Sequence, residues 1–482
     1  MARPPRSLLI RDAELWNGGS AGHRTDVLVE NGTIAGIGND LTTESADRVI
    51  DAGGGLLLPG LHDHHIHVAG LAVRAQSVWC GPPQVTNGAQ LRSVLDGAQG
   101  SGWIRGIGYH ESVLDGLPDA RTLDRFAPDR PLRMQHRSGR MWLLNSAALD
   151  LLLASGDAPP GLERDAGAFT GRLFDEDAWL RKALGSLPPD FSAISLQLAR
   201  LGITGLTDMT PQNGVEMAAH FASQRASGAL LQNVTLAGTL ELAEAQQDGW
   251  SLGPVKLHLH EADLPPFDET VALARAAHDQ GRALAIHCVS EVEIVFALAV
   301  LEEVGSLSSD RIEHASIASP THVEQMACKG VAVCVQPHFV AERGDQYLTD
   351  VEPRLHADLY RLASLCNAGI AMAGGSDAPF ASPDPWSAMR AAVSRKTDSG
   401  QSIGPAEALT PEQALALWLA DPADLSWQRE IALGAAADLC LLSQPWANAR
   451  ERFDPADVAL TVASGQIVHD GIDQPPVERG SR

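Results

Sequence analysis

Basic residues, cysteine motifs and long apolar runs are all scarce in this sequence. Only 36 Lys and Arg stand against 60 Asp and Glu, which gives a formal net charge of −24. Such a surface repels phosphate backbones and anionic lipid headgroups. No apolar run approaches the length of a membrane span, and the run near the N-terminus is too short for a signal peptide. We therefore expect a soluble cytoplasmic protein with neither a nucleic-acid nor a membrane partner.

The cysteines exclude a further class of protein. They are scattered, lie mostly in apolar segments and show no Cys-x-x-Cys spacing: Cys80, Cys288, Cys328, Cys334, Cys366 and Cys440. A disulfide framework is therefore not expected, and we interpret these residues as reduced thiols of the core.

The two ends of the chain carry short alternating stretches that predict strands and hairpins. Residues 26–29 and 33–37 flank an Asn-Gly pair, and residues 437–442 and 458–462 repeat the style near the other end. Neither end has enough apolar surface to fold alone convincingly, and chain termini often lie close together. We expect residues 1–58 and 431–482 to form one small β-sandwich domain.

Between these ends, apolar runs of strand length alternate with helical stretches, which indicates βα units around a parallel sheet. Ser319-Pro320 and Thr410-Pro411 are typical helix starts. We place a first strand at Leu56 and seven more at 203–209, 233–236, 255–260, 283–289, 311–315, 331–336 and 370–376. The predicted fold class is α/β, with a (β/α)8 TIM barrel over residues 59–430.

Residues 71–195 are left over as a long insertion after strand one. The insertion contains two strand-like runs, 103–108 and 131–136, and one of them could belong to the barrel instead. Loops of this length are usually functional. We interpret the insertion as a lid or subdomain.

The most informative stretch is 61–67, Leu-His-Asp-His-His-Ile-His. Neutral imidazole is the commonest side-chain metal ligand, and His65 and His67, two apart in extended backbone, point the same way. A polar loop with surface histidines is the alternative. Burying ionisable groups at strand ends is costly unless they are paired or bind a metal. Four such groups end apolar strands farther along: Lys256, His287, His314 and Asp377.

In these residues the chain resembles the amidohydrolase superfamily, and within it amidohydrolase family 3, which includes N-substituted formamide deformylases and relatives of D-aminoacylases. The resemblance covers nearly the whole chain. Its motifs are 59–67, Val255-Lys256, Ile286-His287, Glu313-His314 and 375–379. It implies the barrel, the terminal β-sandwich and a hydrolytic centre with one or two metals.

The resemblance also implies roles for individual residues. His65, His67 and Asp377 would hold the buried metal, His287 and His314 the more exposed one, and Lys256 would bridge both as a lysine carboxylated by CO2. A metal-activated hydroxide would attack the substrate, and Asp377 would shuttle its proton to the leaving amine. Zinc suits such a nitrogen-rich site best, with manganese or iron as alternatives.

One departure from the family pattern leaves the ligands at strand four open. The position four after Lys256 is often acidic in the family but is His260 here, and His258 lies between them on the same strand face. Either histidine could bind metal or substrate. His62 and His64 fall on the face opposite His65 and His67 by parity, so we expect structural roles for them.

Our substrate-binding candidates are Tyr109, His110 and His136 in the insertion, His260, and Gln336 and His338 at the end of strand seven. Solvated loops are an equal alternative for those in the insertion. The predicted function is hydrolysis of a non-peptide C–N bond in an amide, formamide or N-acyl small molecule. The alternative functions are a deaminase, which Glu291 keeps open, a lactone hydrolase and a non-catalytic scaffold. The sequence also leaves open whether the protein forms a homo-oligomer.

Overall fold

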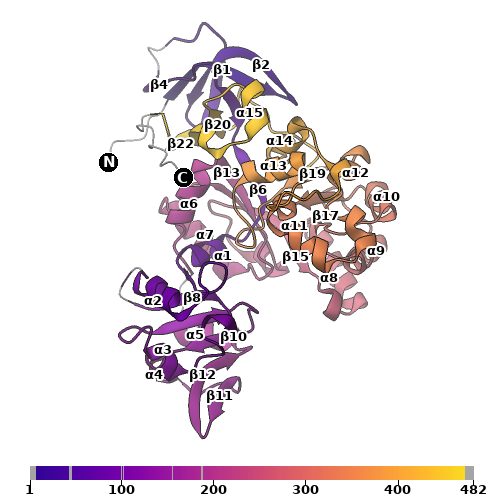
Figure 1. Cartoon of the computed structure of the whole chain (residues 1–482). Helices are drawn as coiled ribbons and strands as arrows, with labels where there is room; N and C mark the ends of the chain where they lie inside the picture. Colours follow the sequence, from indigo (N-terminus) through magenta and orange to yellow (C-terminus); the bar gives the residue numbers. More distant parts are fainter. Residues whose placement is uncertain are drawn as a thin grey trace. The chain divides into compact units, whose positions relative to one another are not determined.

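The computed structural model describes residues 7–42, 46–98, 100, 102–154, 156–185 and 188–472. Its contacts divide the chain into two compact units (Figure 1), one made of residues 1–68 and 190–482 and the other of residues 69–189. No helix within the described ranges is both long enough and apolar enough to cross a membrane.

Parallel strands of the first unit form a barrel, which confirms the predicted fold. In sheet order they are β19 (Met372–Gly374), β18 (Ala332–Val335), β17 (Arg311–His314), β16 (Leu284–Cys288), β15 (Ser251–His258), β14 (Asn233–Gly238), β13 (Ile203–Asp208) and β6 (Leu61–Ile66). Two backbone hydrogen bonds just beyond the strand ends connect the first strand to the last. Asp377 N donates to His65 O (2.6 Å) and His67 N donates to Ala378 O (2.8 Å). The first metal-ligand motif and the last therefore meet where the barrel closes.

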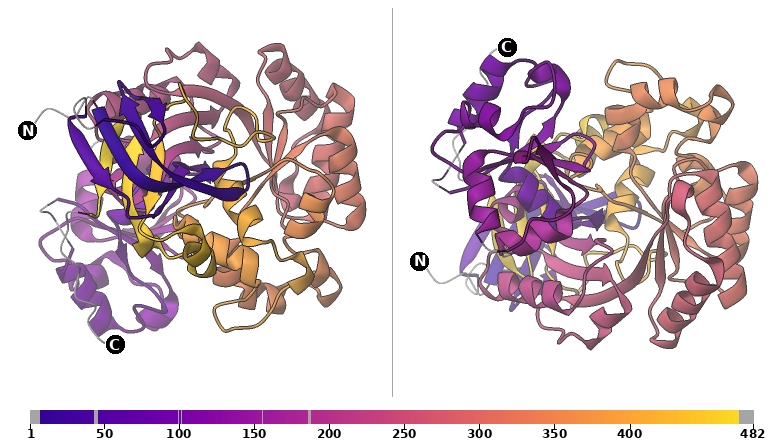
Figure 2. Two further views of the ribbon diagram at one scale, coloured as in Figure 1. Left: turned by 90° about the horizontal axis from the view of Figure 1, so that it is seen from above. Right: turned by 90° about the horizontal axis from the view of Figure 1, so that it is seen from below.

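Helices lie outside the barrel strands (Figure 2). They are α6 (Ser192–Arg200), α7 (Val215–Ala226), α8 (Phe267–Asp279), α9 (Glu291–Val304), α10 (Pro320–Lys329), α11 (His338–Asp350), α12 (Leu362–Asn367), α13 (Pro385–Ser394) and α14 (Pro411–Leu419). The two predicted helix starts are confirmed: Ser319 and Thr410 each cap a helix through a reciprocal capping box, with a proline at its first position. On α10, however, Cys328 is exposed, so the expectation of a core thiol is wrong there. Cys328 lies two positions, or roughly 200°, around the helix from the buried Met326.

The placement of the first barrel strand at Leu56 is wrong. The run at Leu56 is β5 (Leu56–Pro59), which pairs with strands of the terminal sheet, and the barrel strand β6 begins after Gly60. A Cβ on Gly60 would lie 2.2 Å from Thr204 Oγ1, so the chain passes too close to its neighbour for a side chain. Both strands are buried, but β6 carries three histidines and an aspartate, so its sequence lacks the apolar pattern by which a buried strand is predicted. Most of the histidine motif therefore lies within a barrel strand.

A second sheet of this unit takes its strands from both ends of the chain. They are β1 (Ser7–Asn17), β2 (Ser20–Glu30), β3 (Thr33–Ile37), β4 (Arg48–Asp51), β5, β20 (Leu439–Leu442), β21 (Val458–Ala463) and β22 (Gln466–Asp470). Figure 2 shows the indigo and yellow strands side by side, and β5 pairs with β20. A common core of apolar side chains, among them Leu8, Leu57 and Leu439, fills the space that these strands enclose. The short helix α15 (Trp446–Arg452) follows β20.

The unit of residues 69–189 has a sheet of its own. In sheet order its strands are β11 (Leu162–Asp165), β12 (Ala168–Phe174), β10 (Met141–Leu144), β9 (Leu132–His136), β8 (Ile104–Tyr109) and β7 (Val78–Trp79). Its helices are α2 (Gly88–Asp96), α3 (Ala120–Asp124), α4 (Ser146–Leu153) and α5 (Asp177–Leu184), while α1 (Val68–Ala75) spans the boundary. The runs at 103–108 and 131–136 thus form β8 and β9 of this sheet, and neither belongs to the barrel.

Candidate metal centre

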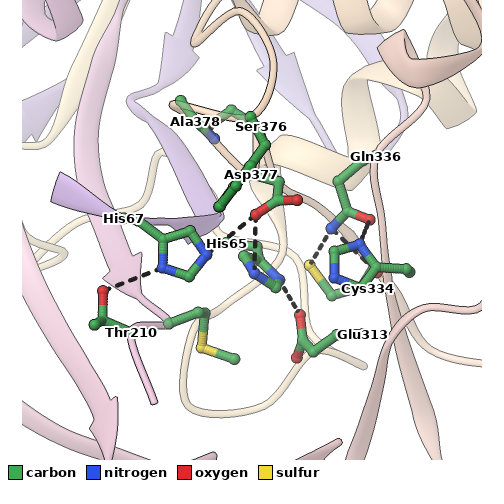
Figure 3. A network of polar contacts seen from close by, with 12 residues as sticks. His65, His67, Thr210, Glu313, Cys334, Gln336, Ser376, Asp377 and Ala378 are labelled. Carbon is green, nitrogen blue, oxygen red and sulfur yellow. Dashed lines mark hydrogen bonds and ion pairs between the residues drawn. The ribbon is translucent and has the colours of Figure 1, made fainter. Parts of the chain in front are cut away.

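Three strand ends bring His65, His67, Glu313 and Asp377 together (Figure 3). His67 Nε2 lies 3.1 Å from Asp377 Oδ1, and His65 Nε2 lies 3.4 Å from the same oxygen. One ligand atom from each of His65, His67 and Asp377 lies within 4.8 Å of the others, a separation that suits one shared ion.

The two histidines predicted for the more exposed metal continue this group. The ring centroids of His65 and His314 are 4.9 Å apart, and those of His314 and His287 are 4.6 Å apart. His314 ends β17 and is buried, whereas His287 on the neighbouring β16 is only partly buried. The rings therefore run from the buried His65 and His314 to the partly buried His287.

Three of these imidazoles have their Nδ1 atom occupied by a neighbour. His65 Nδ1 lies 2.5 Å from Glu313 Oε2, His67 Nδ1 3.1 Å from Thr210 Oγ1 and His314 Nδ1 2.7 Å from Gln336 Oε1. A proton held at Nδ1 leaves Nε2 with its lone pair, which is the form that binds a metal. Burial lowers the pKa of His65 and of His314 well below the ordinary histidine value, so both rings are neutral near pH 7.

Lys256 on β15 is the feature that best tests whether a metal fits here. Its Nζ is buried and has no hydrogen-bond partner among the described residues. Burial lowers the pKa of Lys256, while the charges of Glu313 and Asp377 act in the opposite direction. An unpartnered amine beside neutral imidazoles is costly by itself. A divalent metal and a carboxylated lysine would satisfy the group, so the residues present fit the expected centre.

Two buried charged residues, Arg311 and Glu313, hold the histidine motif in place. Arg311 Nε donates to Glu313 Oε1 at 2.5 Å, and Arg311 Nη2 donates to His64 O at 2.7 Å. Glu313, together with His65 and the thiol of Cys334, also forms a second group whose ligand atoms lie within 4.8 Å. The sequence reasoning missed the roles of these residues. The available signal was a charged residue at each of two positions, 311 and 313, that share one face of an apolar strand.

The loop that carries Asp377 is held in an unusual backbone conformation. Asp377 has φ +51°, and His314 on the neighbouring side has φ +72°. A carboxylate keeps this loop in place, because Asp63 Oδ1 accepts from both His65 N (3.1 Å) and Ser376 N (2.9 Å). A Cβ on Gly375 would lie 2.4 Å from His65 Cβ. Such locally strained residues persist where the surroundings over-determine them, as they do at functional sites.

The two extra histidines at strand four lie beside the group. The ring centroid of His258 is 4.6 Å from that of His260 and 4.5 Å from that of His287. The strand ends at His258, so the placement of His260 within it is wrong; His260 precedes a short 3-10 helix, and both side chains are exposed. Partial desolvation by the surrounding protein atoms, together with the nearby His260 and Lys256, lowers the pKa of His258 to about 4. His62 and His64 pack against each other instead, with ring centroids 4.4 Å apart, and His62 contacts Thr207.

Two of the substrate candidates contact site-bearing residues instead of an open pocket. Gln336 is fully buried and holds His314, as described above. His338 is also buried, and its Nε2 donates to the carbonyl of Ser376 at 2.8 Å, next to Asp377. Both residues therefore position the site in this structure.

The three candidates in the unit of residues 69–189 differ among themselves. Tyr109 is fully buried in the core of that unit, and its hydroxyl donates to Gly116 O at 2.6 Å. This contact gives Tyr109 a packing role. His136 Nε2 lies 3.2 Å from Glu111 Oε2, and His110 Nε2 lies 3.6 Å from the same oxygen. His110, Glu111 and His136 therefore form one polar cluster.

Comparison with known proteins defines the class of the molecule. A model of the amidohydrolase family matches residues 48–469, so the chain belongs to the amidohydrolase family, whose members are metal-dependent hydrolases. It is 26% identical to the N-substituted formamide deformylase of Arthrobacter pascens, over 90% of this chain and 91% of that one. It is also 26% identical to YtcJ of Bacillus subtilis, named as an amidohydrolase, over 95% of this chain and 99% of that one.

A solved structure shows the same fold. A metal-dependent hydrolase of Pyrococcus horikoshii superposes with a TM-score of 0.76 at 20% identity, covering 94% of this chain and 98% of that one.

Proposed function

We propose that the protein hydrolyses a non-peptide C–N bond in an amide, formamide or N-acyl small molecule. Membership of the amidohydrolase family supports hydrolysis, and the name of the Arthrobacter relative supports a C–N bond of this kind. The observation that carries the proposal is the buried, unpartnered Nζ of Lys256 in the same barrel mouth as the neutral imidazoles and Asp377. A barrel with only a scaffolding role gains nothing from burying an amine in this way.

The metal ligands in this proposal are His65, His67, Lys256, His287, His314 and Asp377, with zinc as the first choice and manganese or iron as alternatives. One or two bound divalent ions supply Lewis acidity, which polarises the scissile carbonyl and makes water a nucleophile near neutral pH. The chain's own contribution before any reaction is orientation: Glu313, Thr210 and Gln336 each contact the Nδ1 of one imidazole and leave its Nε2 directed toward the site.

Asp377 is the residue that moves the proton. Its Oδ1 already lies next to His67 and His65. Its Oδ2 has no partner among the described residues and is not enclosed, so Oδ2 is the atom that accepts a proton from the attacking water. The same oxygen then donates this proton to the leaving nitrogen as the C–N bond breaks. The products are a carboxylic acid and an amine.

An aromatic side chain beside the site suits an apolar substituent. Phe380 is 59% exposed, and its ring centroid lies 5.7 Å from that of His67 in an edge-on arrangement. Arg343 Nη2 donates to Phe380 O at 2.6 Å and holds this loop. We therefore favour substrates whose acyl or N-substituent group is apolar, because Phe380 can cover it.

The test is metal analysis of the purified protein followed by a substrate screen. The panel contains N-benzylformamide, N-acyl amino acids, a γ-lactone and an aminopyrimidine, each with wild type and Asp377→Asn. We expect metal at one or two equivalents and turnover of an amide or formamide that Asp377→Asn abolishes. Turnover of the lactone or the aminopyrimidine alone would replace the proposal, and metal-loaded protein inactive on every class would favour a scaffold.

A further inference from the structure

Two arginines lie side by side on the sheet of residues 69–189. Arg105 on β8 and Arg133 on β9 are register partners in neighbouring parallel strands, so both side chains leave the same face about 4.8 Å apart at the backbone. Both guanidinium groups lie over the indole of Trp142, at 5.3 Å and 5.9 Å from its centroid. Arg133 also lies 5.9 Å from the ring of Trp103. The tryptophans hold two like charges together.

No carboxylate in the described part of the chain forms an ion pair with either arginine. Among the described residues, neither arginine forms an ion pair or a hydrogen bond, and the Nε atom of each is buried without a partner. Their terminal amino groups lack partners too, yet are not enclosed, so they keep access to solvent. The charge of Asp177 acts on Arg105, but Asp177 Oδ1 already accepts from Trp142 Nε1 at 2.9 Å.

Two other arginines of the same unit are paired with carboxylates. Arg172 Nη1 pairs with Glu163 Oε2 at 3.1 Å, and Arg140 Nη2 pairs with Asp175 Oδ2 at 2.7 Å. Burial lowers the pKa of Arg105 to about 10, and the charge of Arg133 adds to this lowering. Both groups nevertheless stay charged at neutral pH. Adjacent partly buried charges of one sign repel each other, so the pair is costly unless something binds to it.

We infer that Arg105 and Arg133 form a binding site for a dianionic phosphate group. A guanidinium presents its N–H donors as a planar fork that matches two oxygens of a carboxylate or phosphate. One fork satisfies a carboxylate, whereas two adjacent forks suit a group with at least three oxygens and two negative charges. The indole faces that hold the forks, by cation–π contact, also restrict their motion before binding. All residues of this site lie in the unit of residues 69–189.

The test uses the full-length, metal-loaded protein at constant ionic strength, titrated with inorganic phosphate, phenyl phosphate, sulfate and acetate. Binding is followed by calorimetry and by tryptophan fluorescence, since Trp142 and Trp103 line the site. We expect phosphate to bind at one equivalent and to alter the fluorescence, and acetate to bind at least tenfold more weakly. Phenyl phosphate distinguishes the two sources of a phosphate group. If it binds as well as inorganic phosphate, the site has room for the substituent of a phosphate ester; if it binds more weakly, the site suits the free ion.

The variants Arg105→Gln and Arg133→Gln should each weaken phosphate binding at least tenfold, and Arg140→Gln, whose side chain is paired with Asp175, should leave it unchanged. Arg105→Lys keeps the positive charge but lacks the planar pair of N–H donors, so its affinity for phosphate should be intermediate. This variant replaces a Gln variant that does not fold. Without phosphate, each Gln variant should melt no lower than wild type, because repulsion is relieved. Phosphate binding that survives in both Gln variants, or Gln variants that melt lower and bind equally well, would overturn the inference.

Discussion

Glu313 Oε2 lies 2.5 Å from His65 Nδ1, and both side chains are fully buried. The other carboxylate oxygen is held by Arg311. The carboxylate therefore fixes both the ring orientation and the tautomer of His65, which then presents Nε2 toward Asp377.

Replacing Glu313 by Gln should weaken metal binding by about 10–100-fold. The amide cannot carry the charge that stabilises the Nδ1 proton, and it leaves the positive charge of Arg311 without its carboxylate partner. Affinity is measured by competition with a chromogenic chelator, with Glu303→Gln, at a helix end remote from the site, as control. Equal metal affinity in Glu313→Gln and wild type would show that His65 needs no such support.

Asp377→Asn should keep the fold but lower kcat by about 10³-fold or more, because the variant loses a ligand and the proton carrier together. Near-ultraviolet circular dichroism checks the fold, and metal content is measured alongside turnover. Asp398→Asn is the matched control, since Asp398 is exposed and its side chain forms no hydrogen bond or ion pair among the described residues. A decrease of only a few fold would assign the proton to another group.

Much of the barrel was predictable because each βα unit repeats a strong local pattern. The runs around Ile203, Leu284 and Arg311 are apolar and are bounded by caps or turns, so the strands fall close to their predicted limits. The barrel strand β6 was not predictable in this way, since three histidines and an aspartate hide a buried strand from the hydrophobic pattern.

The candidate site also has a part that the sequence predicts and a part that it does not. Ligand types and strand ends follow from the motifs, but the contact between His65 and Glu313 joins residues 248 positions apart. Local pattern holds no information on such a contact. Tyr109 shows the opposite failure: its position beside His110 and Glu111 indicated a polar pocket. A register shift between Gly106 and Tyr109 interrupts the alternation of β8, and the ring of Tyr109 lies in the core.

Substitutions of Tyr109 and His136 should therefore have different effects, the first on stability and the second on substrate preference. Tyr109→Phe removes the hydrogen bond to Gly116 O and should lower stability by about 1 kcal/mol without altering substrate preference. His136→Ala, in the polar cluster with Glu111, should change the ranking of substrates while bound metal stays constant. Thermal unfolding, kcat/KM on two substrates and metal analysis measure these effects. Loss of metal in His136→Ala would contradict the assignment.

The thiols provide a test of burial that depends on pH. Cys328 is exposed, whereas burial raises the pKa of Cys80 and of Cys440 to about 12. At pH 8 a thiol reagent should label Cys328 rapidly and the two buried thiols only on unfolding. An unfolded thiol ionises near pH 8.5, so each buried thiol should reduce stability by about 1.4 kcal/mol per pH unit from there to pH 12. Cys328→Ser, which removes the fast phase, is the control.

Lys256 decides between one metal and two. A buried ammonium beside two cations would be repelled, so the amine must be displaced, stay neutral or react with CO2 to give a carbamate anion and a proton. We expect the carbamate, because Nζ has no partner that would hold it otherwise. Two equivalents of metal should then bind only when bicarbonate is supplied, and Lys256→Ala should lose activity that short carboxylic acids partly restore.

His258 and His260 lie on the same side of the site as His287 and are the rival ligands. If they bind the metal, Lys256→Ala keeps its metal and most of its activity, whereas His258→Ala or His260→Ala loses both.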